Sequence, residues 1–241
     1  MYGMYGYGYG YGLDPTIILV LIGVALSLWA QGRVNSTVLE IFQSPQHDWH
    51  DRGRGGETPF KCAGIYDVTV QQIAGELTDH YDPRTKTVNL SQSVYGATSV
   101  AAIGVAAHEC GHAMQDNEGY APLRFRSALV PVANFGSSLS WPLILLGLVF
   151  GGLGSPLVEI GILMFSLAVL FQLVTLPVEY NASARAVRLL DAQGILAGEE
   201  VNGTRKVLNA AALTYVAAAA TSILQLLRLI ILFGGRNRRD R

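Results

Sequence analysis

The chain has 241 residues, enough for one catalytic unit with a few membrane helices but too few for two large independent domains. Half of the residues are hydrophobic and 15% are charged, against roughly 25% in an ordinary soluble domain, so a lipid bilayer is the natural surrounding for the apolar surface. The formal net charge of −1 excludes a general basic field for phosphate groups, and we therefore expect no nucleic-acid partner.

The N-terminal region divides into a tail and a first membrane segment. Residues 1–15 form a low-complexity Tyr/Gly tail that lacks the basic stretch of a cleavable signal peptide. Residues 16–31 are predicted to be an uncleaved transmembrane anchor. The apolar run is short for a span of about 20 residues, but Trp29 and the neighbouring tyrosines suit the interfacial layers and extend it.

The next region, residues 32–127, is a polar head that holds eight of the seventeen basic residues and all five histidines. Strand-like alternation around the turn Asp82-Pro83-Arg84 predicts a small β-hairpin that ends near Leu90. An alanine-rich stretch with apolar residues at helical spacing then predicts one helix from about Thr98 to Gln115.

The C-terminal half is mostly apolar. Residues 128–177 predict a transmembrane helical hairpin broken once by GGLGSP, because Glu159 is the one charge between Ser137 and Pro177. Residues 178–206 predict a polar helix and loop, and residues 207–235 an apolar helix that contains Arg228 and either spans the membrane or lies along its surface. A basic tail, 236–241, closes the chain. We expect a mainly α integral membrane protein with three or four membrane helices.

The distribution of basic residues predicts the topology. The head and residues 178–206 are rich in Lys and Arg and GGLGSP has none, so both polar parts are predicted to be cytoplasmic in a multi-pass protein of the inner (plasma) membrane. A spanning last helix would put the basic tail outside, against the same rule, whereas an interfacial helix would not. Cys62 and Cys110 are expected to be free thiols, which fits a reducing compartment.

The residues His108-Glu109-Cys110-Gly111-His112 form an HExxH motif. Two helical residues four positions apart lie about 40° from each other around the axis, so both imidazoles reach one Zn²⁺. Glu109 faces the remaining coordination position, where a carboxylate acts as general base towards a water molecule. By average composition the motif arises by chance in well under about 1% of chains of this length. The alternative is two surface histidines that flank a solvated glutamate.

A catalytic zinc takes three protein ligands, and Glu179 is the best third ligand. The two spans of the hairpin return the chain to the side that it left, and this brings residue 179 to the leaflet of the HExxH helix. Glu118 is too close in sequence to the motif, and Glu159 is placed near the far side of the membrane. The alternative for Glu179 is an interfacial charge at the exit of the hairpin.

The HExxH motif, LPVEYNASARA after a membrane hairpin, GELTDHYDPRTKT, RSALVPVAN and KVLNAAALTYVAAA together resemble the YugP-type neutral zinc metallopeptidases of bacterial membranes, from about Ile65 to Phe233. The resemblance implies a zincin-like α+β head. In the more distant HtpX and CAAX-prenyl-protease group, the glutamate of an E-x-x-A-D helix is the third ligand. Glu179 and Ala182 match that pattern, but Ser183 replaces the aspartate, so Ser183 or Asn181 is expected to orient a zinc histidine.

Weaker signals lie beside the motif. His80, Tyr81 and Asp82 are suited to stabilise an oxyanion or position a substrate, although a plain hairpin turn that uses Asp-Pro is the simpler and preferred explanation. The strand Thr87–Leu90 offers an edge for a bound peptide. Arg185 either pairs with a carboxylate near the metal or lies on a solvated face.

These features predict a membrane-bound zinc-dependent endopeptidase. Its partners are a peptide or membrane-protein substrate and the lipid bilayer, and the sequence leaves open a membrane partner or a homo-oligomer. The alternative is a catalytically silent metal-binding scaffold or interaction subunit, although retention of Glu109 argues against it. A metal transporter would want ionisable groups along its spans, and few are present.

Overall fold

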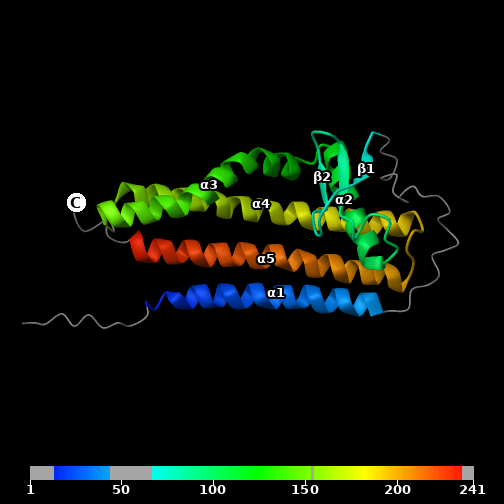
Figure 1. Ribbon diagram of the computed structural model, residues 1–241, viewed down its shortest axis with the longest axis horizontal. Coiled ribbons are helices and arrows are strands. Elements are labelled where there is room, and N and C mark those ends of the chain that lie inside the picture. Colours follow the sequence, from blue (N-terminus) through cyan, green and yellow to red (C-terminus); the bar gives the residue numbers. More distant parts are fainter. Residues whose placement is uncertain (1–13, 44–66, 153–154, 235–241) are drawn as a thin grey trace, which may run out of the picture.

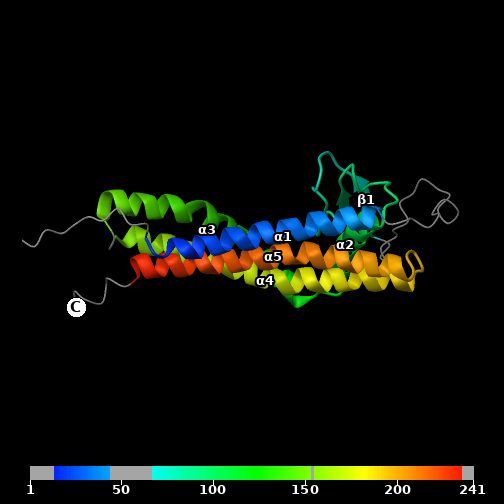
Figure 2. The same cartoon turned by 90° about the horizontal axis from the view of Figure 1, so that it is seen from below.

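The computed structural model describes residues 14–43, 67–152 and 155–234. The Tyr/Gly tail up to residue 13, Cys62 and the basic tail lie outside these ranges. Four long helices form one layer, packed in the order α3 (Ala121–Gly151), α4 (Pro156–Ala192), α5 (Glu199–Phe233) and α1 (Ile17–Gln43), as Figures 1 and 2 show. Each is long and apolar enough to cross a membrane, which confirms the expectation of a mainly α membrane protein.

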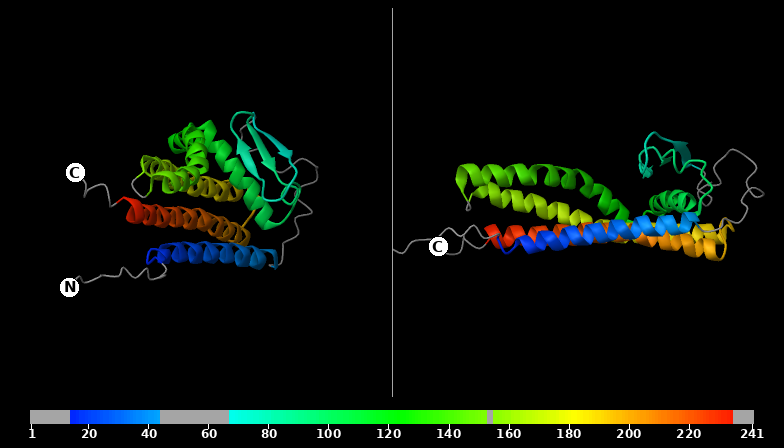
Figure 3. Two further views of the ribbon diagram at one scale, coloured as in Figure 1. Left: turned by 60° about the vertical axis from the view of Figure 1, so that its left-hand side comes forward. Right: turned by 60° about the horizontal axis from the view of Figure 1, so that its bottom comes forward.

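The polar head sits at one end of this layer (Figure 3). It consists of helix α2 (Val100–Asn117) and a small sheet of β1 (Thr69–Gln72), β2 (His80–Asp82) and β3 (Thr87–Leu90). Helices α1 and α4 run towards the head, whereas α3 and α5 run away from it. The last turn of α3 and the first turn of α4 therefore lie at the opposite end, together with the end of α5.

Helix α4 extends the expected second span into the head without a break. Its apolar part, Leu157 to Val178, is about 33 Å long at 1.5 Å per residue, which matches a hydrocarbon core of about 30 Å. The helix passes through Pro177 and continues to Ala192. The sequence had suggested that Glu179 begins a separate helix, and the structure does not contain one. Instead, Glu179 lies inside a helix of 37 residues, directly after the membrane-spanning part.

The last apolar run also belongs to a longer element. Helix α5 begins at Glu199, has 35 residues, packs along α1 and α4, and is long and apolar enough to cross a membrane. The Arg228 guanidinium lies 3.6 Å from the Asp14 carboxylate and donates a 3.3 Å hydrogen bond to Thr16, at the start of α1. The charge in this apolar run is therefore paired where α1 and α5 meet, away from the head.

The sheet confirms the hairpin and adds a third strand. Strands β2 and β3 pair antiparallel around the Asp82-Pro83-Arg84 turn, while β1 pairs parallel with β3 on its other side. The order β1-β3-β2 makes β3 the central strand, fully buried along its length. The expectation that Thr87–Leu90 offers a free edge was therefore wrong, and the outer strand beside the HExxH helix is β2.

Helix α2 lies between the sheet and the long helices. It begins after Ser99, whose hydroxyl accepts a 3.2 Å hydrogen bond from the Ala102 amide, and it extends two residues beyond the predicted end at Gln115. Its small residues, such as Ala107, pack in one core with residues of α4, such as Leu190. At Gly111 even a methyl group would overlap the carbonyl of Ala182, so the α2 and α4 backbones nearly touch.

Cys110 is buried in this core and is disulfide-bonded, so the expectation of a free thiol there was wrong. The argument from cysteine for a reducing compartment is therefore lost. The expected orientation of the head now depends on the charges of the loops alone.

Gly111→Ala should destabilise the fold by about 1–3 kcal/mol, because its new methyl group has to push α2 away from α4. The midpoint of thermal unfolding in detergent measures the effect. Gly32→Ala is the matched control, since nothing lies within 4 Å of the added atom on α1. Equal midpoints for the two variants would contradict the close approach at Gly111.

Candidate metal centre

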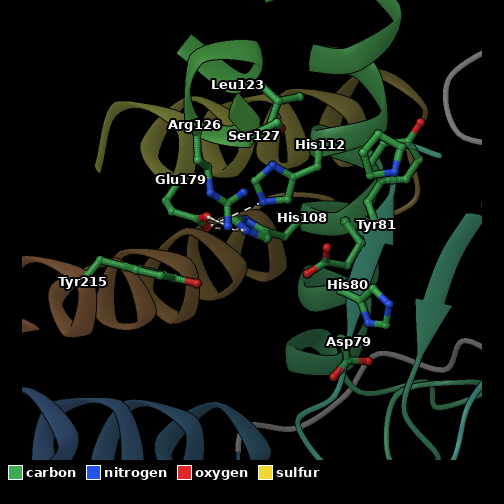
Figure 4. Close-up of a pocket in the computed structure, with 12 residues that line it drawn as sticks. Asp79, His80, Tyr81, His108, His112, Leu123, Arg126, Ser127, Glu179 and Tyr215 are labelled. Atoms are coloured by element: carbon green, nitrogen blue, oxygen red, sulfur yellow. Dashed lines mark hydrogen bonds and ion pairs between the residues drawn. The ribbon is translucent and has the colours of Figure 1, made fainter. Parts of the chain in front are cut away.

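Two histidines of α2 and one glutamate of α4 meet at the membrane end of the head (Figure 4). The Nε2 atoms of His108 and His112 lie 3.1 Å and 3.6 Å from the same oxygen, Oε2 of Glu179. One ligand atom from each of the three side chains lies within 4.8 Å of the other two, and all three are largely withdrawn from water. The three residues expected to bind metal are thus brought together, although His108 and Glu179 are 71 residues apart in sequence.

Both imidazoles are oriented through their Nδ1 atoms. The Nδ1 of His108 lies 3.1 Å from the Ser183 hydroxyl, and that of His112 lies 3.0 Å from the Oε1 of Gln115. These contacts leave both Nε2 atoms directed at Glu179. If each Nδ1 donates its proton to Ser183 or Gln115, the Nε2 lone pairs are free to bind a metal ion. Ser183 therefore contacts a histidine as expected, whereas Asn181 does not do so directly.

Gln115 links the second histidine to α4. It is fully buried, and its amide nitrogen donates to the Val178 carbonyl at 2.8 Å and to Oδ1 of Asn181 at 2.9 Å. This fixes the amide so that its oxygen faces His112. Because Val178 precedes Glu179, one side chain ties the ring of His112 to the backbone beside the third ligand.

Arg185 supports this link from outside. Its Nε donates a 2.7 Å hydrogen bond to Asn181, and its two terminal nitrogens bind both carboxylate oxygens of Glu118 at 2.6 and 2.8 Å. The hydrogen bonds from Arg185 lower the pKa of Glu118. Arg185 therefore pairs with a carboxylate at the end of α2 rather than with one at the histidine cluster.

The cluster suits a divalent cation. Two imidazole nitrogens and one carboxylate oxygen are the donor set of a catalytic zinc site with an open fourth position. Burial disfavours a charged His112, yet the Glu179 and Glu109 carboxylates outweigh burial and raise the pKa of this imidazole.

A pocket opens in front of the cluster. Glu109 lines this pocket from α2, and 8% of the surface of Glu109 is exposed. The sheet side contributes Asp79, His80, Tyr81 and Pro83, but Asp82 is not among the lining residues. The Tyr81 hydroxyl donates a 2.9 Å hydrogen bond to Asp116, and burial together with this contact raises the pKa of Tyr81.

Several lining residues were not singled out from the sequence, and Arg126 and Tyr215 are two of them. Arg126 comes from α3, and its Nη2 lies 3.6 Å from Oε1 of Glu179, the oxygen that faces away from the histidines. Tyr215 enters from α5 (Figure 4). A sequence signal existed for each: Arg126 is the last charge before an apolar run, and Tyr215 is an isolated aromatic residue in an alanine-rich stretch.

Comparisons with known proteins agree with this picture. Residues 16–234 match the family model described as "Putative neutral zinc metallopeptidase". The chain is 45% identical over 221 residues to the "Putative membrane protease YugP" of Bacillus subtilis (strain 168). The matched region covers 90% of this chain and 96% of the relative. No solved structure matches the chain significantly.

Gln115→Leu should weaken zinc binding by about 10- to 100-fold, because it frees the ring of His112 to rotate while keeping a side chain of similar size. Competition with a chelator, read out as bound zinc per protein, measures the change. Gln193→Leu makes the same replacement at an exposed residue and should bind zinc like the wild type. Unchanged zinc affinity in the Gln115 variant would show that its hydrogen bond does not matter.

Proposed function

Because the chain belongs to the neutral zinc metallopeptidase family, we propose that it is a membrane-bound endopeptidase that hydrolyses peptide bonds with water. One observation carries the proposal: His108, His112 and Glu179 converge within 4.8 Å, and Glu109 lines the same pocket. This arrangement contains all the protein groups that zinc-assisted hydrolysis needs.

In this proposal His108, His112 and Glu179 hold the zinc ion and Glu109 is the general base. The ion, when bound, polarises the scissile carbonyl and makes water more acidic. Glu109 takes a proton from the attacking water and delivers it to the nitrogen of the leaving amine. The low exposure of Glu109 favours this exchange, since few solvent molecules compete for its carboxylate.

The position of the site along the long helices suggests the substrate class. Glu179 directly follows the membrane-spanning part of α4, and Arg126 is the last charge before the apolar part of α3. Both lie at one membrane boundary, so the scissile bond is presented at the bilayer surface. Membrane proteins cut next to their spans, or peptides held at the interface, are therefore the proposed substrates.

The sheet offers a way to hold such a substrate. Strand β2 is an outer strand, and its residues His80 and Tyr81 line the pocket. An extended peptide that adds to this edge would form backbone hydrogen bonds and pass in front of the histidines. The distribution of basic residues favours a cytoplasmic head in the plasma membrane.

The alternative is a silent metal-binding scaffold or interaction subunit. Such a protein would need the three ligands but not a buried carboxylate at position 109. A transporter is disfavoured because Arg228, one of the few charges in the spans, is already bound to Asp14 at the end remote from the cluster. Peptide hydrolysis gives a role to the three proposed ligands and to Glu109 as well.

Glu109→Gln should abolish peptide cleavage and leave zinc content unchanged, because it removes the base and no ligand. Cleavage of a membrane-protein substrate in proteoliposomes and zinc analysis of the same sample give the two readouts. Glu76→Gln, at an exposed residue of the head, is the control that should cut normally. Cleavage by the Glu109 variant at the wild-type rate would refute the mechanism.

Cleavage should also depend on the distance of the target bond from the membrane. A single-span substrate with its cleavable segment next to the span should be cut faster than the same segment moved outward by a rigid helical spacer. Equal rates for the two, or a preference for the same peptide free in solution, would argue against an interfacial substrate.

A further inference from the structure

We propose that Tyr215 is a further catalytic residue, whose hydroxyl donates a hydrogen bond to the scissile carbonyl oxygen as this oxygen gains negative charge. The inference rests on the proposed function and assigns a role to a helix, α5, that carries none of the three expected ligands. It concerns stabilisation of the transition state rather than binding of the metal.

The location of Tyr215 is the first argument. Its side chain projects from α5 towards Glu179 and the two imidazoles, on the side of the site away from the labelled strand residues in Figure 4. Tyr215 lines the same pocket as Glu109 and Glu179, and its hydroxyl is near enough to Glu179 for a hydrogen bond. Tyr215 keeps 37% of its surface exposed, so a substrate has access to it.

The donors on the sheet side are held by partners away from the proposed ligands, whereas the partner of Tyr215 is Glu179 itself. The Tyr81 hydroxyl is committed to Asp116 at 2.9 Å. Both ring nitrogens of His80 also have contacts, Nδ1 with the Thr78 carbonyl at 2.8 Å and Nε2 with Asn89 at 3.2 Å. The strand residues expected from the sequence to stabilise an oxyanion are thus already engaged.

Arg126 adds a positive charge near Tyr215, which offsets part of the effect of the Glu179 and Glu109 carboxylates there. Its Nη2 contacts Oε1 of Glu179 at 3.6 Å, while its buried Nε has no hydrogen-bond partner within the described residues. Arg126 and Tyr215 line the same pocket, and a cation there would help to stabilise negative charge that develops on the substrate oxygen. We regard Arg126 as a positioning residue that contacts Oε1 of Glu179, the oxygen that is not shared with the histidines.

The chemical step balances without a proton from Tyr215. Water adds through its oxygen to the carbonyl carbon, one proton passes to Glu109, and the carbonyl π electrons move to the oxygen that Tyr215 faces. When the carbon–nitrogen bond breaks, these electrons re-form the carbonyl and the nitrogen takes the proton from Glu109. The phenol donates a hydrogen bond throughout and remains protonated.

Tyr215→Phe tests the proposal, because it removes the hydroxyl and keeps the ring. We expect kcat to fall about 100-fold with KM and zinc content unchanged, as for loss of one oxyanion donor. Affinity for a phosphonamidate peptide, which carries a tetrahedral anion, should fall by a similar factor. Substrate binding measured in a Glu109→Gln background should stay the same with or without the Tyr215 change.

The matched control is Tyr180→Phe, which makes the same replacement on α4 beside Glu179, at a residue that is 44% exposed and does not line the pocket. It should behave like the wild type. Tyr215→His, which restores a donor, should recover part of the lost rate, which a purely structural role would not produce.

The outcomes separate the two proposals. If the wild type cleaves peptides and Tyr215→Phe retains both kcat and phosphonamidate affinity, the role of Tyr215 is refuted and the peptidase function stands. Loss of zinc or of the fold in Tyr215→Phe, with no rescue by histidine, would also refute the catalytic role. Absence of cleavage by the zinc-loaded wild type would overturn both proposals together.

Discussion

The contact between α2 and α4 decides whether a metal centre exists at all. Two imidazoles come from one helix and the carboxylate from the other, so the three groups meet only while the helices lie at nearly the shortest distance that two backbones allow. Gly111 permits this approach, and Gln115 locks its register by binding His112 and the Val178 carbonyl together. Packing of small residues therefore determines the coordination geometry.

Features that depend on local spacing could be predicted from the sequence. The four-residue interval between His108 and His112 defines a helical face, and the turn at Asp82-Pro83-Arg84 defines a hairpin; the structure contains both. Glu179 needed a longer argument, namely that a chain crossing a membrane twice returns to its starting side. That argument works because a bilayer restricts the paths available to the chain.

Other features could not be predicted, because they depend on which distant segments pack together. No local pattern reveals that β1 pairs parallel with β3, or that Gln115 has its partners on α4. Arg126 and Tyr215 are brought to the pocket by α3 and α5, whose apolar patterns predict a membrane but not a rotation about the helix axis. The wrong expectations, a free edge at Thr87–Leu90 and a free Cys110 thiol, failed for the same reason.

The uninterrupted course of α4 connects the chemistry to the lipid. One continuous helix runs from Pro156 through a candidate membrane span to Glu179, the proposed third ligand. Sliding that helix by a single residue would move the carboxylate about 1.5 Å, whereas zinc–ligand distances tolerate only about 0.2 Å. If α4 spans the bilayer, its depth and tilt, which depend on bilayer thickness, would therefore affect assembly of the proposed metal site.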